Sequence, residues 1–105
     1  MAAKGYWIAN SIIHDMDGLV RYRNANREAM NRYGAKFIIM HGQHQDVEQP
    51  ARLYPENWTV VEFPSYPDAV ACYEDPTYLE AAKSRRSVAD GTQTIIEGYD
   101  GTQGF

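Results

Sequence analysis

The chain has 105 residues, of which 44% are hydrophobic and 12% aromatic. That is enough apolar material for one folded core and too little for two, so we expect a single folded domain. A formal net charge of −4 repels nucleic acids and anionic membranes. No apolar run approaches the roughly 18 residues of a membrane span, and no signal-peptide pattern is present. We therefore expect neither a nucleic-acid nor a membrane partner.

The chain contains one cysteine, Cys72, which has no partner for an intrachain disulfide. This usage is typical of a reducing compartment, so we expect a cytoplasmic protein. No Cys-His signature accompanies the residue. A small buried side chain is therefore favoured over a nucleophile.

The first half of the chain predicts a strand, a helix and a second strand. Gly5 to Ile13 is strand-like, with apolar side chains on both parities. Asp15 can cap a helix from Met16 to about Tyr33, and Gly34 supplies the left-handed stop expected after a helix end. Lys36 to Met40 is apolar at consecutive positions, which indicates a buried strand.

A polar excursion joins this strand to the next one. Residues 41–57 are rich in turn-forming and polar side chains, so we expect a hairpin-like loop. Val47 could extend the preceding strand by a few residues. Pro50 and Pro55 make a long regular element unfavourable.

The central stretch combines a strand with two helix starts. Trp58 to Phe63 is β-branched and aromatic, which predicts a buried strand stopped by Pro64. Ser65 can cap one helix, and Asp75 followed by Pro76 can begin another. We expect the core faces of these two helices to be formed by Tyr66, Ala69, Val70, Tyr73, Tyr78, Leu79, Ala82 and Ala89.

The last regular element is a strand from Thr92 to Glu97, opened by Gly91 and ended by Gly98. Residues 99–105 lack periodicity and form a tail that frays or is pinned by its aromatic side chains. We therefore expect one domain over residues 1–98 and a tail over residues 99–105. The element order is typical of an α+β, ferredoxin-like βαββαβ fold, with a four-stranded antiparallel sheet and helices on one face.

The alternation of side chains along the strands predicts that a second protein surface covers the sheet. Four pairs of neighbouring residues place large apolar groups on both faces: Tyr6-Trp7, Ile38-Ile39, Val60-Val61 and Ile95-Ile96. The helices of one chain cover only one face. We therefore expect a homodimer that packs sheet to sheet.

These segments together resemble a bacterial family known as domain of unknown function 1330. The resemblance rests on the N-terminal KGYWIA, the run VVEFPSYPDAVACYEDPTYLEAAKSRR and the closing IIEG, and it covers nearly the whole chain. It implies a dimeric α/β barrel, the fold of small antibiotic-biosynthesis-type monooxygenases, muconolactone isomerases and stress-response barrel proteins. It implies no activity, because the family is named for lacking one.

The resemblance also carries over individual positions. The recurrent family residues correspond to Tyr6, Tyr22, Gly34, Phe37, Glu62, Phe63, Pro64, Tyr73, Pro76, Tyr78, Arg85, Glu97 and Gly98. This chain departs from the pattern at Ala35, where a second glycine is usual. It departs again at His41-Gly42-Gln43, where an Arg-Gly-Gly-like turn is usual, so an anion contact from that turn is not carried over.

Two side chains are candidate catalytic groups, Glu62 and His14. Glu62, like Glu97, ends an otherwise apolar strand, and low dielectric raises a carboxyl pKa unless a cation such as Arg85 pairs with it. The alternative is that both glutamates lie in solvent or form structural ion pairs. His14 follows the first strand and is equally compatible with a strand-end role.

Candidate ligand-binding residues are Tyr22, Arg85, Tyr78 and His41. For the two tyrosines, which lie on apolar helix faces, core packing with a satisfied hydroxyl is the competing interpretation.

A metal site is the weakest of the hypotheses. His14, His41 and His44, with Asp46 or Glu48, supply suitable ligand types. However, His41 and His44 lie in a glycine-containing turn and no cysteine supports them. We expect no metal and no cofactor.

Two functions are compatible with these residues and with the expected fold. In one, the protein is a dimeric module that binds a small organic molecule between sheet and helices. In the other, it is a cofactor-independent enzyme that catalyses proton transfer or oxidation in the same cleft. A filled interior would favour the first, and a cavity with a pKa-shifted Glu or His the second.

Overall fold

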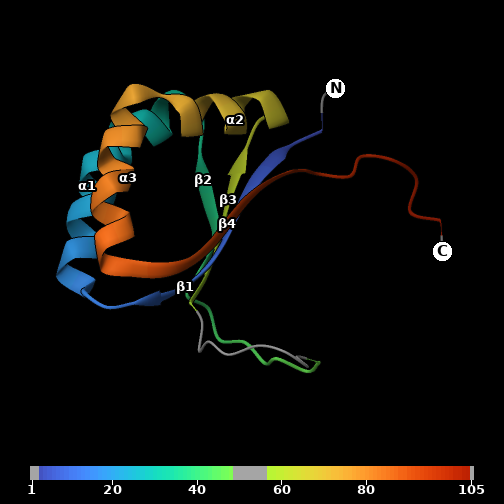
Figure 1. Cartoon of the computed structure of the whole chain (residues 1–105). Helices are drawn as coiled ribbons and strands as arrows, with labels where there is room; N and C mark the ends of the chain where they lie inside the picture. Colours follow the sequence, from blue (N-terminus) through green and yellow to red (C-terminus); the bar gives the residue numbers. More distant parts are fainter. Residues whose placement is uncertain (1–2, 49–56, 105) are drawn as a thin grey trace.

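A computed structural model of the chain describes residues 3–48 and 57–104. Its elements are β1 (Gly5–Ile13), α1 (Met16–Arg32), β2 (Lys36–Met40), β3 (Asn57–Phe63), α2 (Tyr66–Glu74), α3 (Pro76–Val88) and β4 (Ala89–Glu97). The strands form one antiparallel sheet in the order β2-β3-β1-β4. The helices lie together on one face of that sheet (Figure 1). The predicted ferredoxin-like α+β fold is confirmed.

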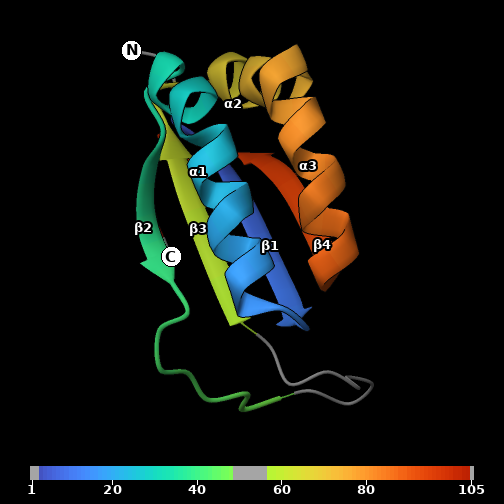
Figure 2. The ribbon, with the colours of Figure 1, turned by 90° about the vertical axis from the view of Figure 1, so that its left-hand side faces the viewer.

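The helices begin where the sequence predicts. The carboxylate of Asp15 accepts the Gly18 amide at the start of α1, and the Ser65 hydroxyl accepts the Asp68 amide at the start of α2. Such side-chain acceptors satisfy amides that have no partner within the helix. Helices α1 and α3 lie side by side over the sheet, and α2 crosses one end of it (Figure 2). None of the described helices is long and apolar enough to cross a membrane.

The core lies between the helices and the inner face of the sheet. Trp7 on β1 is paired with Val61 on β3 and Ile95 on β4, which places these side chains on the helix side. The indole N–H of Trp7 donates to the Ala69 carbonyl at 2.9 Å, and the centroid of the Trp7 ring lies 4.8 Å from that of Tyr78. Aromatic contacts of this kind add to the area that the rings bury.

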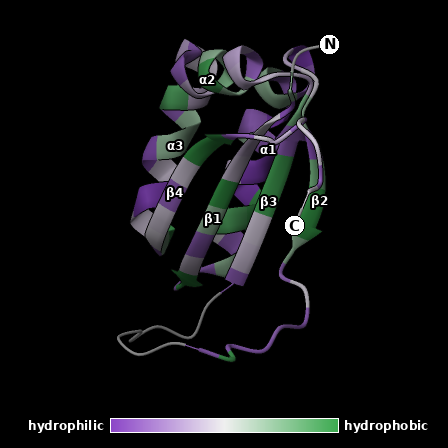
Figure 3. Ribbon diagram, turned by 90° about the vertical axis from the view of Figure 1, so that its right-hand side faces the viewer, coloured by the Kyte–Doolittle hydropathy of each residue, from purple (hydrophilic) through white to green (hydrophobic). Residues whose placement is uncertain are grey.

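The outer face of the sheet is also apolar. Its alternating positions include Tyr6, Ile8 and Val60, which are half-buried, and Ile39 and Ile96, which are 45% and 47% exposed. Apolar bands run along the strands of this face, and no helix covers them (Figure 3). Residues 99–104 leave the sheet on the same side (Figure 1).

The prediction that Lys36–Met40 is buried was wrong. Every residue of β2 is exposed, Phe37 by 42%. The reason is its place at the edge of the sheet, where it has one strand neighbour. Val47 does not extend β2 and is 82% exposed, while Pro50 and Pro55 lie outside the described residues.

The predicted boundary between the last helix and the last strand was also wrong. Helix α3 ends at Val88, and Ala89 opens β4 by pairing with Ile13. Gly91 therefore lies inside the strand. A Cβ atom there would come within 2.1 Å of the Asn10 carbonyl oxygen, so the close approach of β4 to β1 requires glycine.

The predicted core faces of α2 and α3 need a correction. Tyr66 and Leu79 are 38% and 40% exposed, whereas Ala81 is buried. Cys72 is buried, as the sequence predicts. The buried stripe is therefore rotated toward smaller residues, which let α2 and α3 approach the sheet closely.

Because Phe63 is 1% exposed and Tyr66 is 38% exposed, their replacement has unequal effects. We expect Phe63→Ala to lower the free energy of unfolding by about 3–5 kcal/mol through lost burial and the cavity left behind. Tyr66→Ala should lower it by less than about 1 kcal/mol. Urea denaturation followed by circular dichroism measures both, and equal losses would contradict this description of the core.

Asp75 connects the end of α1 to the junction of α2 and α3. Its carboxylate accepts hydrogen bonds from Arg32 Nη1 at 2.7 Å, from the Tyr33 hydroxyl at 2.9 Å and from the Thr77 amide at 2.8 Å. Burial by itself would raise the pKa of Asp75, but these hydrogen bonds and the Arg32 charge hold that pKa below its ordinary value. The carboxylate therefore stabilises the fold only while it is ionised.

We expect the stability contributed by the Asp75 charge to be complete above its ordinary pKa of about 4 and to be lost as the pH falls through the lowered value. Asp75→Asn retains a capping side chain but removes the charge. The variant should be less stable than the parent at pH 7, and the difference should shrink at pH 3. Urea midpoints at both pH values test this, and a constant difference would contradict it.

Candidate functional site

A cavity of about 70 Å³ lies between the sheet and helices α1 and α3. It exists because the inner face of β1 changes from the large Trp7 to the small Ala9 and Ser11, opposite Gly91 on β4. Its apolar wall is formed by Trp7, Leu19, Met30, Phe37 and Val61. A mostly apolar hollow with a few polar groups is the usual form of a small-molecule site.

Two polar groups at this cavity have no hydrogen-bond partner among the residues that the structure describes. The Arg85 Nε and the Gln93 Nε2 are both buried and form no hydrogen bond to the described part of the chain. Buried donors are nearly always paired, because losing water without replacement is unfavourable. These two donors therefore indicate a position where a bound molecule would supply acceptors.

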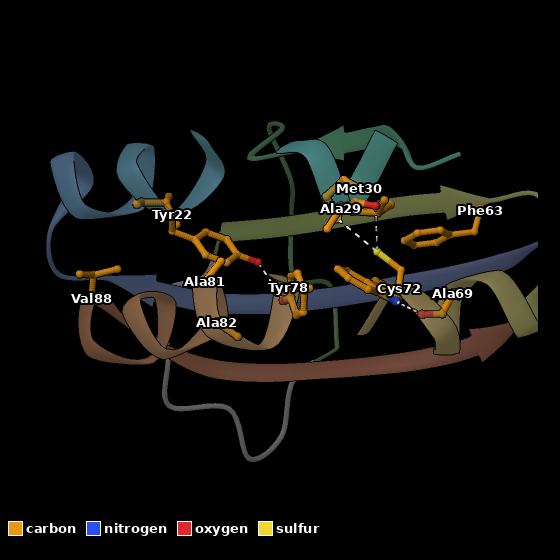
Figure 4. Packing of buried hydrophobic residues seen from close by; sticks show 13 residues of the cluster. Tyr22, Ala29, Met30, Phe63, Ala69, Cys72, Tyr78, Ala81, Ala82 and Val88 are labelled. Carbon is orange, nitrogen blue, oxygen red and sulfur yellow. Dashed lines mark hydrogen bonds between the residues drawn. The ribbon is translucent and has the colours of Figure 1, made fainter. Parts of the chain in front are cut away.

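A pair of tyrosines forms one side of the cavity. The hydroxyls of Tyr22 and Tyr78 lie 2.8 Å apart (Figure 4). Burial, reinforced by Tyr78, raises the pKa of Tyr22 far above its ordinary value. Tyr22 lines the cavity, whereas Tyr78 is fully buried behind it. Tyr78 thus acts on the site by holding the Tyr22 hydroxyl.

His41 lies at the edge of the cavity in an unusual backbone conformation. Its φ of +53° is in the left-handed region, and its amide donates to the Trp58 carbonyl at 2.7 Å. The imidazole Nε2 lies 3.1 Å from Arg23 Nη2. A guanidinium only donates, so Nε2 accepts and the ring is neutral. Burial first, and then the Arg23 charge, lower the pKa of His41.

The charged side chains that line the cavity are positive. Among the described residues, the lining includes Arg23 and Arg85 but no aspartate or glutamate, although the chain as a whole carries a net charge of −4. A cleft lined by one sign of charge concentrates ions of the opposite sign. The site is therefore suited to an anion.

Of the predicted site residues, the structure brings Tyr22, Arg85 and His41 together and places Glu62 elsewhere. Glu62 lies on the outer face of the sheet, where it accepts from Lys4 Nζ at 3.1 Å and from the Tyr6 hydroxyl at 3.3 Å. The hydrogen bond from Lys4 is the main reason that the pKa of Glu62 is lowered although burial raises it. Glu62 therefore forms a structural ion pair, and its partner is Lys4 instead of Arg85.

His14 and His44 are likewise outside the cavity. His14 Nε2 lies 2.6 Å from Asp90 Oδ2 at an exposed end of β1, and His44 lies 3.7 Å from Asp46. The three histidines thus occupy separate places. Within residues 3–48 and 57–104, no group of three His, Cys, Asp or Glu side chains is arranged to hold a metal ion.

Sequence reasoning missed three residues of this site. Asn26 occupies a core position of α1 and is 4% exposed, and the sequence alone does not separate a buried asparagine from an exposed one. Arg23 is one of several arginines on this helix, and only the structure shows that its side chain lines the cavity. Nothing in the sequence distinguishes Gln93 from the other polar residues of β4.

Residues 4–99 match the family described as domain of unknown function 1330. The chain belongs to this family. No match was found among curated proteins.

Two solved structures share the fold. RPA0582 from Rhodopseudomonas palustris, a protein of unknown function, superposes with a TM-score of 0.75 at 15% identity, over 96% of this chain and 86% of that one. SnoaB from Streptomyces nogalater, a cofactor-independent oxygenase, superposes with a TM-score of 0.63 at 8% identity, over 98% of this chain and all of that one. Identities this low show a common fold and nothing further.

We expect His41 to titrate below its ordinary pKa of about 6.5 in an NMR pH titration of the side-chain resonances. Arg23→Gln should raise the pKa of His41, because the neighbouring positive charge that disfavours protonation is removed. A pKa of His41 that is unchanged by Arg23→Gln would contradict the contact.

Proposed function

We propose that this family member binds a small organic anion with an apolar body in the cavity between the sheet and helices α1 and α3. The observation that carries the proposal is the pair of buried, unpartnered donors on Arg85 and Gln93 in a lining without carboxylates. The planar guanidinium of Arg85 fits a carboxylate or enolate oxygen pair. An apolar wall that includes Trp7 favours a ring or hydrocarbon body.

A catalytic function is the second candidate, and His41 favours it. Its neutral imidazole, held at the cavity edge by a left-handed backbone and by Arg23, is in the protonation state of a general base. When an anionic ligand draws the Arg23 guanidinium toward itself, the Nε2 lone pair is released to accept a proton. The fold shared with SnoaB, a cofactor-independent oxygenase, is compatible with such chemistry.

The biological unit that we propose is a homodimer packed sheet to sheet. Ile39 and Ile96 remain almost half-exposed on the outer face, next to the half-buried Tyr6, Ile8 and Val60. A contiguous apolar surface of this kind is unusual for a soluble monomer. A second copy related by two-fold symmetry would cover it with the same surface.

Arg85→Gln should weaken binding of a small aromatic carboxylate, with benzoate as the probe, at least about tenfold, because a charge-assisted hydrogen bond is lost. Arg86→Gln is the matched control, since Arg86 is the exposed neighbour on α3. Isothermal titration calorimetry measures both affinities. Failure of the parent protein to bind any small organic acid, or equal affinity in both variants, would rule out the proposed site.

Ile39→Glu should convert the dimer to a monomer, because the interface would bury an unpaired charge. Val20→Glu is the control, since Val20 is exposed to a similar degree, 47%, but lies on helix α1. Sedimentation velocity over a concentration series distinguishes the states. A parent protein that remains monomeric at all concentrations would contradict the sheet-to-sheet dimer.

A further inference from the structure

A groove adjoins the cavity on the outer side of α1, between that helix and β2. It holds about 330 Å³ of open space and is lined by Arg23, Asn26, Arg27, Met30, Asn31, Ala35, Phe37 and Met40. Arg23, Asn26, Met30 and Phe37 also line the inner cavity. The two hollows therefore meet at these four side chains.

The groove combines an apolar floor with two cationic side chains. Met30, Phe37 and Met40 supply the floor, and Arg23 and Arg27 project from successive turns of α1. Residues four apart lie on the same side of a helix, so these two guanidinium groups are neighbours. As in the cavity, no aspartate or glutamate within residues 3–48 and 57–104 lines the groove.

These two arginines differ from others on the same helix. Arg21 lies 3.6 Å from the Asp15 carboxylate, and Arg32 lies 2.7 Å from that of Asp75. Arg23 contacts neutral His41, and Arg27 donates to the Asn24 side-chain carbonyl at 2.9 Å. Neither has a carboxylate partner in the described part of the chain. Each guanidinium has five N–H donors, so most of them remain for a ligand.

The groove is independent of the surface that we assign to a second copy of the chain. Phe37 is paired with Val61, whose side chain faces the helices. The floor of the groove thus belongs to the helix side of the sheet. A sheet-to-sheet dimer would leave it open.

The inner cavity is smaller than a typical small-molecule site. Its 70 Å³ is well below the roughly 300–1,000 Å³ of typical small-molecule sites. The adjoining groove supplies the missing space. A molecule whose anionic head lies at Arg85 would therefore extend past Met30 and Phe37 to Arg23 and Arg27.

We infer that the ligand is a two-headed organic acid, with one anionic group at Arg85 in the cavity and a second at Arg23 and Arg27 in the groove, joined by an apolar spacer. The inference rests on the proposed function, because it takes the inner anion site as given. The inference adds to the proposed function a second anion subsite and a dicarboxylate-like class of ligand.

Calorimetry with matched acids tests this inference. Each straight-chain dicarboxylate from succinate to suberate is compared with the monocarboxylate of the same chain length, together with terephthalate against benzoate, all at one ionic strength because salt screens exposed charges. For the parent protein, the diacid of the best-fitting length should bind at least about tenfold more tightly than its monoacid, since it gains a second charge-assisted contact.

Arginine variants assign the two heads. Arg27→Gln should remove the advantage of the diacid and leave the affinity for the monoacid unchanged, whereas Arg85→Gln should weaken both. Arg21→Gln, on the same helix but paired with Asp15, should change neither. Equal affinities for diacids and monoacids at every length, or an undiminished diacid advantage in Arg27→Gln, would overturn the two-headed ligand while leaving the inner site in place. Binding of no acid at all would overturn both.

Discussion

The site depends on a change in side-chain size along the inner face of β1. At one end of the strand, Trp7 packs against Phe63 and Tyr78 and fills the space between sheet and helices. At the other end, Ala9 and Ser11 are too small to do so. Protein interiors are close-packed, so a hollow persists only where small residues and rigid surroundings prevent collapse. The packing around Trp7 therefore holds α1 and α3 at a fixed distance from the sheet, and that distance keeps the space next to Ala9 and Ser11 open.

Electrostatics gives this hollow its chemical character. The chain is acidic overall, yet its carboxylates near the helices are used in caps and ion pairs, as in the contacts of Asp75 with Arg32 and Thr77. The polar side chains that line the cavity and the groove, among the described residues, are arginine, histidine and neutral groups. Because these cations are not neutralised locally, an incoming anion would gain their full interaction. Glu62 is paired with Lys4 on the outer face of the sheet, away from the arginines that line the cavity.

The sequence was most informative where a local signal determines local structure. Ser65 and Asp75 identified helix starts, and runs of β-branched and aromatic residues identified the strands. It was less reliable where the outcome depends on neighbours distant in the chain. The apolar residues of β2 predicted burial, but its place at the sheet edge leaves it exposed. Likewise, the apolar strand around Glu62 predicts a buried carboxyl group. Only the pairing of β1 with β3 places Tyr6 and Lys4 beside it.

For the site, the sequence identified Tyr22, Arg85 and His41 as candidates, and it could not show that they surround one cavity. Asn26, Arg23 and Gln93 have no sequence signature, because their roles arise from the register of β4 and from the rotation of α1 over the sheet. What the sequence determined by itself was the order and type of the elements, the family and the two apolar faces of the sheet, since these follow from short-range periodicity and composition. The tertiary structure alone decided which polar groups face inward, because that depends on packing between segments separated by up to about 80 residues along the chain.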